Sequence, residues 1–554
     1  MKSKYTIEIM KTKLILVAGV AIASMMALTA ERPNVVIILA DDMGFSDIGA
    51  YGGEIETPHL DRLAEGGMKF SRFYNSARCC PTRASLMTGL HPHQTGIGWM
   101  TNPPETFKYD HGPDFPSYRG HLNRNCVTMA EVMKGNGYAT ILAGKWHLGM
   151  NKQERWPLQR GFEKFYGSLA GATNFFYPEN PRGITVGNRQ IEDPESTTDR
   201  RYYTTDAFTD HAIRYIKEEK AAQDRPFFLY LAYTSPHWPL HAHQEEVQKY
   251  VGKYKMGWDA LREQRLKRQR ELGLIAKDWK LSQRSHIGWD EIDEAKKIEM
   301  DLRMANYAAM IDRMDQNIGK LVAYLDETDQ LDNTLIMFFS DNGACQEGGK
   351  LGGKTDPHEL ETWERTYGAG PAYGEVWANA SNTPFRKFKH YTHEGGLSTP
   401  FIAHWPKGIK PRKNWYTDPA YLIDLAPTVY ALTGAKYPRS YAGNAIPELT
   451  GVSLASAFEG KTIKRSQPLY FEHEDHAALM DGKWKLVGSK VSVPGGPNEQ
   501  NWELYDIEAD RSETNDLAKS RPEVLSRLSK EWLAWANSVG VFPKPATRST
   551  EVKK

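Results

Sequence analysis

Short apolar runs alternate with helical patterns along the first two thirds of the chain. The apolar runs are typical of strands buried on both faces; they are residues 35–40, 139–143, 227–233 and 335–339. Helical patterns begin at Thr57-Pro58 and at the capping box of Thr128 and Glu131, and a long one covers residues 304–321. This alternation predicts an α/β fold, a mostly parallel central sheet flanked by helices.

The pattern changes near residue 465, where short strands with antiparallel character replace the long apolar runs. The expected strands are residues 468–473, 478–480, 483–487 and 502–505. Asp481-Gly482 is a typical two-residue hairpin turn, and a closing helix is expected from about Pro522 to Ser538. We therefore predict a small C-terminal α+β domain with an antiparallel sheet over residues 465–554.

Residues 253–284 form a basic, polar helical pattern that interrupts the alternation. Its cationic side chains are Arg262, Arg265, Lys267, Arg268 and Arg270. One interpretation is a solvated excursion from the sheet, and the other is a rim that attracts an anionic substrate.

The amino terminus has the features of a secretory signal peptide. Lys11 and Lys13 precede the apolar residues 14–23, and small residues continue to Ala30. A membrane anchor is the alternative, but the apolar run is shorter than the ~20 residues that a span needs. We expect residues 1–30 to be removed and the protein to be exported, periplasmic or secreted, without stable membrane insertion.

Composition narrows the classes of function. The 554 residues include 70 basic and 69 acidic side chains, a net charge of +1, so no long-range field attracts nucleic acid and none is expected as a partner. Four cysteines are too few to hold so long a chain together by disulfide bonds, which excludes a disulfide-stabilised scaffold. Because the net charge is close to zero, a site that binds an anion must depend on positive side chains placed next to it.

Polar side chains follow each of the four expected core strands, where an open α/β sheet binds its ligands. They are Asp41 and Asp42, Lys145 and His147, His237, and Asp341 and Asn342. Adjacent carboxylates at a buried strand end repel each other and require a cation. Because the carboxylate and amide side chains offer only oxygen, the set predicts a site for a hard cation such as Ca²⁺ or Mg²⁺.

The segment 79–89, Cys-Cys-Pro-Thr-Arg-Ala-Ser-Leu-Met-Thr-Gly, is the most specific in the chain. A thiol phosphatase needs an arginine six residues after its cysteine, but Ser85 and Leu86 stand there. Zinc and thioredoxin-like sites need two cysteines separated by two residues, and the chain has no such pair. A pair of buried structural cysteines remains the simple alternative.

Residues 348–355, Gly-Gly-Lys-Leu-Gly-Gly-Lys-Thr, satisfy the spacing of a phosphate-binding loop. Such a loop must join a strand directly to a helix, whereas residues 341–347 intervene here and Asp356-Pro357 follows. We instead expect a mobile glycine-rich loop near the active site.

Cys79, Pro81 and Arg83, followed by Ala84 and Thr88-Gly89, resemble the signature of the sulfatase family, whose cysteine is converted to formylglycine (3-oxoalanine). The chain looks closest to bacterial arylsulfatases, also in segments 44–49 and 144–149. The resemblance implies an alkaline-phosphatase-like fold, a catalytic domain over residues 31–464, one Ca²⁺ (rather than Mg²⁺) and a formylglycine-generating maturation enzyme as a partner.

The resemblance also assigns roles to ten positions. Asp41, Asp42, Asp341 and Asn342 match the family's calcium ligands, with the modified Cys79 beside the metal. Arg83 and Lys145 match groups that hold the aldehyde hydrate, and His147 matches the residue hydrogen-bonded to it. His237 and Lys389 match groups around the bound sulfate; Glu394-Gly395-Gly396 places Lys389.

The implied activity is hydrolysis of sulfate monoesters, in aryl sulfates or sulfated carbohydrates, to an alcohol and inorganic sulfate. In an aldehyde hydrate one hydroxyl attacks sulfur, and the other then loses its proton and expels sulfate. His237 is the candidate acid for the leaving oxygen, and His147 the candidate base for the second step. The candidate groups for substrate specificity are Tyr74, residues 99–118, Trp238 and residues 473–476.

Two other functions remain open from the sequence. A phosphodiester or phosphonate monoester hydrolase shares this fold and can use the same modified nucleophile. A catalytically silent glycan-binding relative belongs to another class, and the intact Cys79, Arg83 and His147 argue against it.

Overall fold

The computed structural model describes residues 32–103, 106–196 and 200–546. The expected signal peptide, residues 1–30, lies outside them. A ten-stranded sheet in the order β10-β2-β9-β8-β1-β7-β3-β4-β5-β6 forms the centre. Its strands are β1 (Asn34–Ala40), β2 (Met68–Tyr74), β3 (Ala139–Gly144), β4 (Lys164–Gly167), β5 (Ile184–Val186), β6 (Arg189–Ile191), β7 (Phe227–Ala232), β8 (Thr334–Ser340), β9 (Ser398–His404) and β10 (Ala420–Tyr421).

The middle of this sheet is parallel, as the alternating pattern predicts. β1 pairs in parallel with β7 on one side and β8 on the other, so Val36 lies between Leu229 and Ile336. β3 continues the parallel set beside β7, whereas β9 runs antiparallel to both β2 and β8. The side chains of β1, β3, β7 and β8 are almost entirely buried. The expected α/β class is therefore confirmed.

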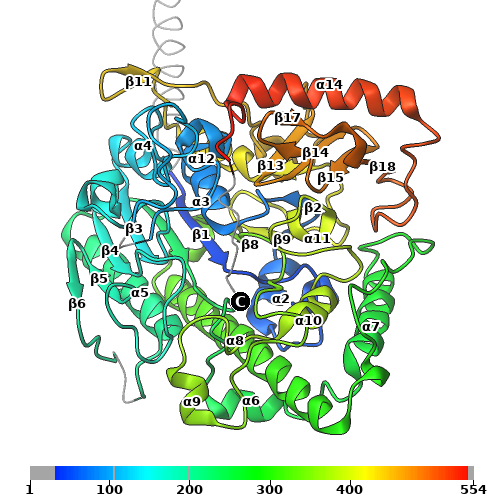
Figure 1. Ribbon diagram of the computed structural model, residues 1–554. Helices are drawn as coiled ribbons and strands as arrows, with labels where there is room; N and C mark the ends of the chain where they lie inside the picture. The colour runs from blue at the N-terminus through cyan, green and yellow to red at the C-terminus, as the bar shows by residue number, and fades with distance from the viewer. Residues whose placement is uncertain (1–31, 104–105, 197–199, 547–554) are drawn as a thin grey trace, which may run out of the picture.

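Helices cover both faces of the sheet (Figure 1). Val36 and Ile38 of β1 face a core shared with the long helix α8 (Glu294–Glu327) and α5 (Thr204–Ala222). Val35 and Ile37 face the opposite core. That second core includes α3 (Cys79–Thr88), α4 (Met129–Gly135) and α12 (Leu425–Thr433). The other helices are α2 (Pro58–Glu65), α6 (Gln244–Tyr250), α7 (Gly257–Glu271), α9 (Leu360–Arg365), α10 (Gly374–Ser381), α11 (Glu394–Leu397) and α13 (Ala455–Phe458).

A small antiparallel sheet follows near the C-terminus and lies at the upper right of Figure 1. Its strands, in order, are β13 (Leu469–His473), β14 (His476–Asp481), β15 (Trp484–Gly488) and β18 (Trp502–Asp506). One face joins the second core, and the other packs against α14 (Pro522–Val539). Two short ribbons, β11 (Ser440–Tyr441) with β12 (Asn444–Ala445) and β16 (Ser492–Val493) with β17 (Gly496–Pro497), complete the strands. The expected antiparallel sheet is confirmed.

The basic segment 253–284 agrees only in part with the solvated interpretation, since Lys267 and Arg268 are exposed. Two of its arginines are buried in α7 instead of facing solvent. Arg265 forms ion pairs with Asp47 at 2.6 Å and Glu54 at 2.8 Å, and Arg262 donates to the Ser282 carbonyl at 2.6 Å. Net charge along the segment gave no sign of the Arg265 partners, because Asp47 and Glu54 lie about two hundred residues earlier in the chain. Arg265 fastens the segment to the loop after β1, and Arg262 joins two parts of the segment itself.

Candidate active site

The carboxyl ends of the parallel strands bring the expected polar residues together. The amide of Asp41, just after β1, donates to the Ser235 carbonyl beyond β7 at 3.0 Å. On the other side of β1, the amide of Asp341 donates to the Ala40 carbonyl at 3.1 Å. Sheet pairing thus continues past the strand ends, so Asp41-Asp42 lies between Asp341-Asn342 and the loop that carries His237.

Buried cations pair with the carboxylates in this group. Lys145 Nζ, at the end of β3, lies 2.7 Å from Asp41 Oδ2. Arg83 on α3 contacts Asp341 Oδ2 through Nη2 at 2.6 Å and Nε at 3.0 Å. All four side chains are fully buried, so loss of one partner would leave an uncompensated charge in the interior.

Asp42 is the centre of a second set of contacts. Lys389 Nζ lies 2.8 Å from Asp42 Oδ2, and His237 Nε2 lies 3.3 Å from the same oxygen. The amide nitrogen of Asn342 donates to Asp42 Oδ1 at 2.6 Å. Asp42 has a left-handed backbone, with φ of 67°, which is uncommon outside glycine and frequent at functional sites.

Cys79 is the first residue of α3 and is buried. It is close enough to Asp42 for a charge on sulfur to influence that carboxylate. The Cys80 hydrogen bond, with the charge of Lys145 and a hydrogen bond from His147, holds the pKa of Cys79 well below its ordinary value despite burial. A low pKa favours the reactive thiolate form.

The two candidate acid–base histidines are both neutral in this arrangement. Burial lowers the pKa of His147 and of His237 to about 4. His237 Nδ1 donates to the Trp238 carbonyl at 2.6 Å, which directs Nε2 toward Asp42 and Lys389. A neutral His147 is suited to accept a proton.

The oxygens of the four expected metal ligands fit a hard divalent cation. Asp41 Oδ1 and Asn342 Oδ1 are buried and have no hydrogen-bond partner, although buried polar atoms are normally satisfied. Burial raises the pKa of Asp41 well above its ordinary value despite Lys145. Arg83 Nη2 lies 3.6 Å from Asp41 Oδ1, beyond hydrogen-bond distance. A cation beside these oxygens would stabilise the charged carboxylate and give both oxygens a direct ligand contact.

A cavity of about 170 Å³ opens onto Cys79, His147, His237 and Lys389. Its charged wall was missed by sequence reasoning, because it depends on tertiary contacts: Glu347 pairs with Arg78 at 2.9 Å and accepts from Trp238 Nε1 at 2.6 Å. The other side chains along it include Asn102, Tyr109 and Arg182. The position of Arg78 directly before Cys79 was the one available hint.

A model of the sulfatase family matches residues 33–435, and one described as N-sulphoglucosamine sulphohydrolase, C-terminal, matches residues 385–535. The chain belongs to the sulfatase family. It is 33% identical over 543 residues to an uncharacterized sulfatase of Schizosaccharomyces pombe, covering 93% of this chain and 95% of the relative. It is 34% identical over 455 residues to an arylsulfatase of Klebsiella aerogenes, covering 79% and 95%. This sulfatase is therefore a sulfuric ester hydrolase.

Solved sulfatase structures share the fold. Ps i-CgsB in complex with k-i-k-neocarrahexaose is 26% identical, with a TM-score of 0.65 over 91% of this chain and 93% of that chain. BT4656 in complex with D-Glucosamine-2-N, 6-O-disulfate is 19% identical, with a TM-score of 0.63 over 94% and 100%. At this identity the second likeness supports the fold alone.

Part of the specificity prediction for this sulfatase is wrong. Trp238 lines the cavity, and so do several residues from 99–118. Tyr74 is instead fully buried, with its hydroxyl 3.5 Å from Glu394, and Tyr118 donates to the Val541 carbonyl at 2.8 Å. Both side chains serve packing between distant segments.

The glycine-rich segment 348–355 lies in the loop between β8 and α9. No strand precedes it directly and no helix follows it directly, which agrees with the rejection of a phosphate-binding loop. The expected mobility is not supported by its contacts. Arg303 of α8 is buried and donates to the carbonyls of Gly353 at 2.8 Å and Thr355 at 2.7 Å, which fastens the loop to the long helix.

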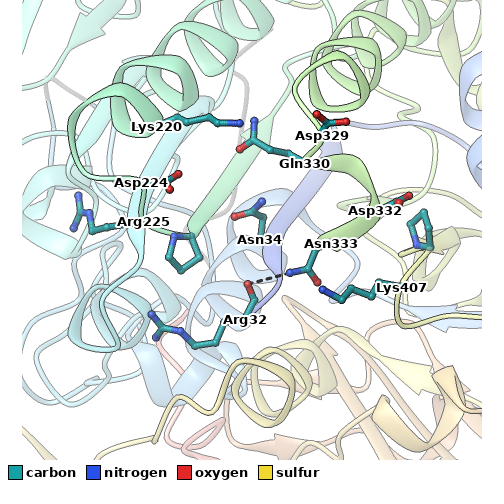
Figure 2. Close-up of a pocket in the computed structure, with 12 residues that line it drawn as sticks. Arg32, Asn34, Lys220, Asp224, Arg225, Asp329, Gln330, Asp332, Asn333 and Lys407 are labelled. Atoms are coloured by element: carbon teal, nitrogen blue, oxygen red, sulfur yellow. Dashed lines mark hydrogen bonds between the residues drawn. The ribbon is translucent and has the colours of Figure 1, made fainter. Parts of the chain in front are cut away.

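A larger cavity, about 810 Å³, lies at the opposite edge of the central sheet, where β1, β7 and β8 begin. Figure 2 shows side chains of both charges around it, including Arg225, Asp332 and Lys407. Asn34 at its centre accepts from the Phe227 amide at 3.1 Å and so serves the sheet. Among the described residues, the groups of possible metal ligands all lie elsewhere. Size alone does not make this cavity the active site.

Proposed function

We propose that this chain is an exported sulfatase that hydrolyses sulfate monoesters through a formylglycine derived from Cys79, with one Ca²⁺ in the site. The observation that carries the proposal is the pocket itself. Cys79, His147, His237 and Lys389 line one cavity, and Asp41 Oδ1 and Asn342 Oδ1, which accept no hydrogen bond, lie in the same cluster of strand ends.

The donor set indicates where each group would be held. Asp41, Asp42, Asp341 and Asn342 would hold Ca²⁺, which when bound supplies positive charge that polarises sulfate oxygens. Converted Cys79 supplies an aldehyde hydrate, which has two hydroxyl groups. After one of them has taken up the sulfate group, the second allows sulfate to be expelled, so water need not attack a stable sulfate ester on residue 79.

The chain's own residues perform the remaining tasks. Arg83, Lys145 and Lys389 are fixed by ion pairs before substrate arrives, so they stabilise negative charge on sulfate oxygens without reorganising. His147 accepts a proton near the hydrate. His237 is neutral in the free site, and an adjacent anionic sulfate raises its pKa toward the range in which it protonates the leaving oxygen.

The cavity mouth favours a substrate with a ring next to its sulfate. Trp238 and Tyr109 offer aromatic surfaces there, and Arg182 adds a cation. The relatives include an arylsulfatase and N-acetylgalactosamine-6-O-sulfatase of Bacteroides thetaiotaomicron. We therefore infer aryl sulfates or sulfated carbohydrates as the substrate class.

Export and maturation complete the proposal. Residues 1–30 have the composition of a signal peptide, which supports a periplasmic or secreted location. Within the described part of the chain, no helix is both long and apolar enough to cross a membrane. A formylglycine-generating enzyme would have to act before Cys79 is enclosed, because the folded chain buries it.

Replacement of Cys79 tests the nucleophile. Cys79→Ala should lower the turnover of nitrophenyl sulfate by at least about 10⁴-fold while keeping the melting temperature. Cys80→Ala is the matched control, since it removes the neighbouring buried thiol outside the Cys-x-Pro-x-Arg spacing, and it should remain active. Equal activity of Cys79→Ala and wild type would refute the proposal.

The same assay separates the alternative hydrolase. Wild-type enzyme should turn over an aryl sulfate with higher kcat/KM than an aryl phosphodiester of the same leaving group. A preference for the phosphodiester would assign the chain to the phosphodiester or phosphonate monoester hydrolases.

A further inference from the structure

A second group of metal-ligating side chains lies where the catalytic part meets the small C-terminal sheet. His390 follows Lys389 in the chain, whereas His473 ends β13 and Glu474 begins the turn to β14. One ligand atom from each of the three residues lies within 4.8 Å of those of the other two. We call these three residues the histidine cluster.

His473 has no other satisfactory partner. Its side chain is 0% exposed, and neither ring nitrogen has a hydrogen-bond partner. A buried polar group left unpaired costs about 1–3 kcal/mol, and such a group calls for a bound water or ion. Burial also lowers the pKa of His473 well below its ordinary value, so the imidazole is neutral and has a free electron pair for a metal.

The spacing in the histidine cluster suits a tetrahedral ion. Glu474 lies between the imidazoles, with Oε2 3.1 Å from His390 Nε2 and Oε1 3.7 Å from His473 Nε2. Metal–ligand bonds of 2.0–2.2 Å in tetrahedral geometry place neighbouring ligand atoms about 3.4 Å apart. The two observed distances lie on either side of that value, but each involves a different oxygen of Glu474, so a single shared oxygen requires a small rotation of the carboxylate.

The backbone holds two of the ligands in uncommon conformations. His390 has φ of 87° and Glu474 has φ of 53°, both in the left-handed region that favours glycine. The His390 amide donates to the Ala77 carbonyl at 2.7 Å, which fixes the turn beside Cys79. Non-glycine residues in this region concentrate at functional sites and ligand clamps.

We infer that His390, His473 and Glu474 form a second metal site, for a transition-metal ion such as Zn²⁺. Two imidazoles and one carboxylate are the nitrogen-rich donor set that Zn²⁺ prefers, in contrast to the all-oxygen set around Asp42. The side chains of His390 and Glu474 are 25% and 29% exposed, which gives the ion a route in and leaves a position for water.

The surroundings are compatible with a cation. Arg78 and Lys544 both act on His473, but each is already paired with a carboxylate, Arg78 with Glu347 at 2.9 Å and Lys544 with Glu472 at 2.6 Å. His476 packs against His390 with ring centroids 4.8 Å apart, and its Nδ1 is buried and unpartnered. The bound ion would join the Lys389 loop to the β13–β14 hairpin and stabilise the contact between them.

The test measures Zn²⁺ binding to the full, untagged chain saturated with Ca²⁺, by calorimetric titration, with Co²⁺ absorption to report tetrahedral geometry. Wild type should bind one Zn²⁺ per chain in addition to Ca²⁺, with a higher melting temperature and a tetrahedral Co²⁺ spectrum. His390→Asn, chosen because asparagine tolerates positive φ, and Glu474→Gln should each weaken binding by at least about 10-fold.

His286→Asn is the matched control. His286 and Glu375 form a similar pair at 2.6 Å, with 26% and 22% exposure, and the metal-ligand groups found among the described residues do not include them. This variant should bind Zn²⁺ as wild type does. Absence of Zn²⁺ binding by wild type, or unchanged affinity in both folded cluster variants, would overturn the inference. Both results are independent of sulfate-ester turnover, so they do not depend on the proposed function.

Discussion

Each strand-end carboxylate has its own buried cation. The pairs are Asp41 with Lys145, Asp341 with Arg83, and Asp42 with Lys389. Because desolvation offsets most of the Coulomb energy, such pairs contribute little net stability. Their role is to hold charged groups in fixed positions around the place where the substrate binds. These three carboxylates and three cations have no net charge together. A bound divalent cation would therefore make the site positive, and an anionic sulfate group would offset that charge.

Gly171 leaves the space that the His147 ring occupies. A Cβ at position 171 would lie 2.5 Å from Cε1 and 2.6 Å from Nε2 of His147. Gly171→Ala should therefore displace the ring and lower kcat about 10–100-fold, with the melting temperature little changed. Gly135→Ala, where a Cβ meets nothing within 4 Å, is the control for steady-state kinetics on nitrophenyl sulfate. A Gly171→Ala enzyme with wild-type kcat would exclude a positioned His147.

Single site residues could be predicted where chemically distinctive side chains lie within a few residues of one another in the sequence. Cys79 and Arg83 lie on one helix, and their identities are readable from the motif. Glu347 was missed as a site residue, because its contacts with Arg78 and Lys389 arise only when the loop after β8 folds over α3. A lone acidic residue in a loop has no feature that distinguishes it in a sequence.

Between elements, a buried charge network connects the small sheet to the central one. Lys485 on β15 contacts Glu394 at 2.9 Å and Glu513 at 2.8 Å. Arg511 binds the same Glu394 at 2.6 Å and the Ser71 carbonyl at 2.6 Å. All four charged side chains are essentially inaccessible to solvent.

Lys485→Met should lower the free energy of unfolding by about 3–5 kcal/mol, because it leaves two buried carboxylates short of a cation. Lys483→Met removes a lysine two residues away that is 48% exposed and paired with Asp506, and it should cost under about 1 kcal/mol. Denaturant unfolding of both variants gives the comparison. Equal losses in the two variants would show that the network does not stabilise the interface.

The difference between wild type and Lys485→Met should depend on pH. Despite burial, Lys485 and Arg511 lower the pKa of Glu394 below 4.5, so its contribution is present above pH 4.5 and is lost as pH falls through the lowered value. Carboxylates raise the pKa of Lys485 above 10.5 against the effect of burial, so its contribution is lost only as pH rises beyond that. The wild-type contribution is therefore constant between about pH 4.5 and 10.5, whereas loss of Lys485 raises the pKa of the buried carboxylates in the variant. The difference should be largest at neutral and alkaline pH and should shrink as pH falls and the variant's carboxylates take up protons.

Elements were predictable where one physical signal dominates. The strand at 35–40 is apolar on both faces, and the structure places β1 at residues 34–40. Segment 253–284 was misjudged because its polarity matches a solvated helix, whereas Arg265 is buried by partners on another loop. The spacing of apolar residues predicts a helix, but it does not predict which charged side chains of that helix form buried ion pairs.

Across the complete fold, the active site draws its residues from loops after β1, β3, β7 and β8, from α3, and from the loop between α10 and α11 that carries Lys389. One face of the C-terminal sheet shares a core with the catalytic part, and we propose residues 31–464 and 465–554 as the two domains. A cation bound at the strand ends would therefore stabilise segments that are hundreds of residues apart in the chain.

Removal of Ca²⁺ should lower both stability and activity. A ligand present at about 1,000 times its dissociation constant stabilises the folded state by about 4 kcal/mol. Treatment with a Ca²⁺-selective chelator should lower the melting temperature and abolish hydrolysis of nitrophenyl sulfate, and added Ca²⁺ should restore both. Asp341→Asn should show a smaller response to Ca²⁺ in the calorimeter. Full activity in protein shown to be free of divalent metal would exclude the proposed role of these oxygens.

The chemical state of residue 79 is the most direct test of the mechanism. Mass spectrometry of the tryptic peptide that follows Arg78, taken from an active preparation, reads it without a substrate. We predict that the Cys79 thiol is replaced by an aldehyde, that Cys80 is unchanged, and that specific activity rises in proportion to the converted fraction. Active enzyme in which Cys79 remains entirely a thiol would contradict the mechanism.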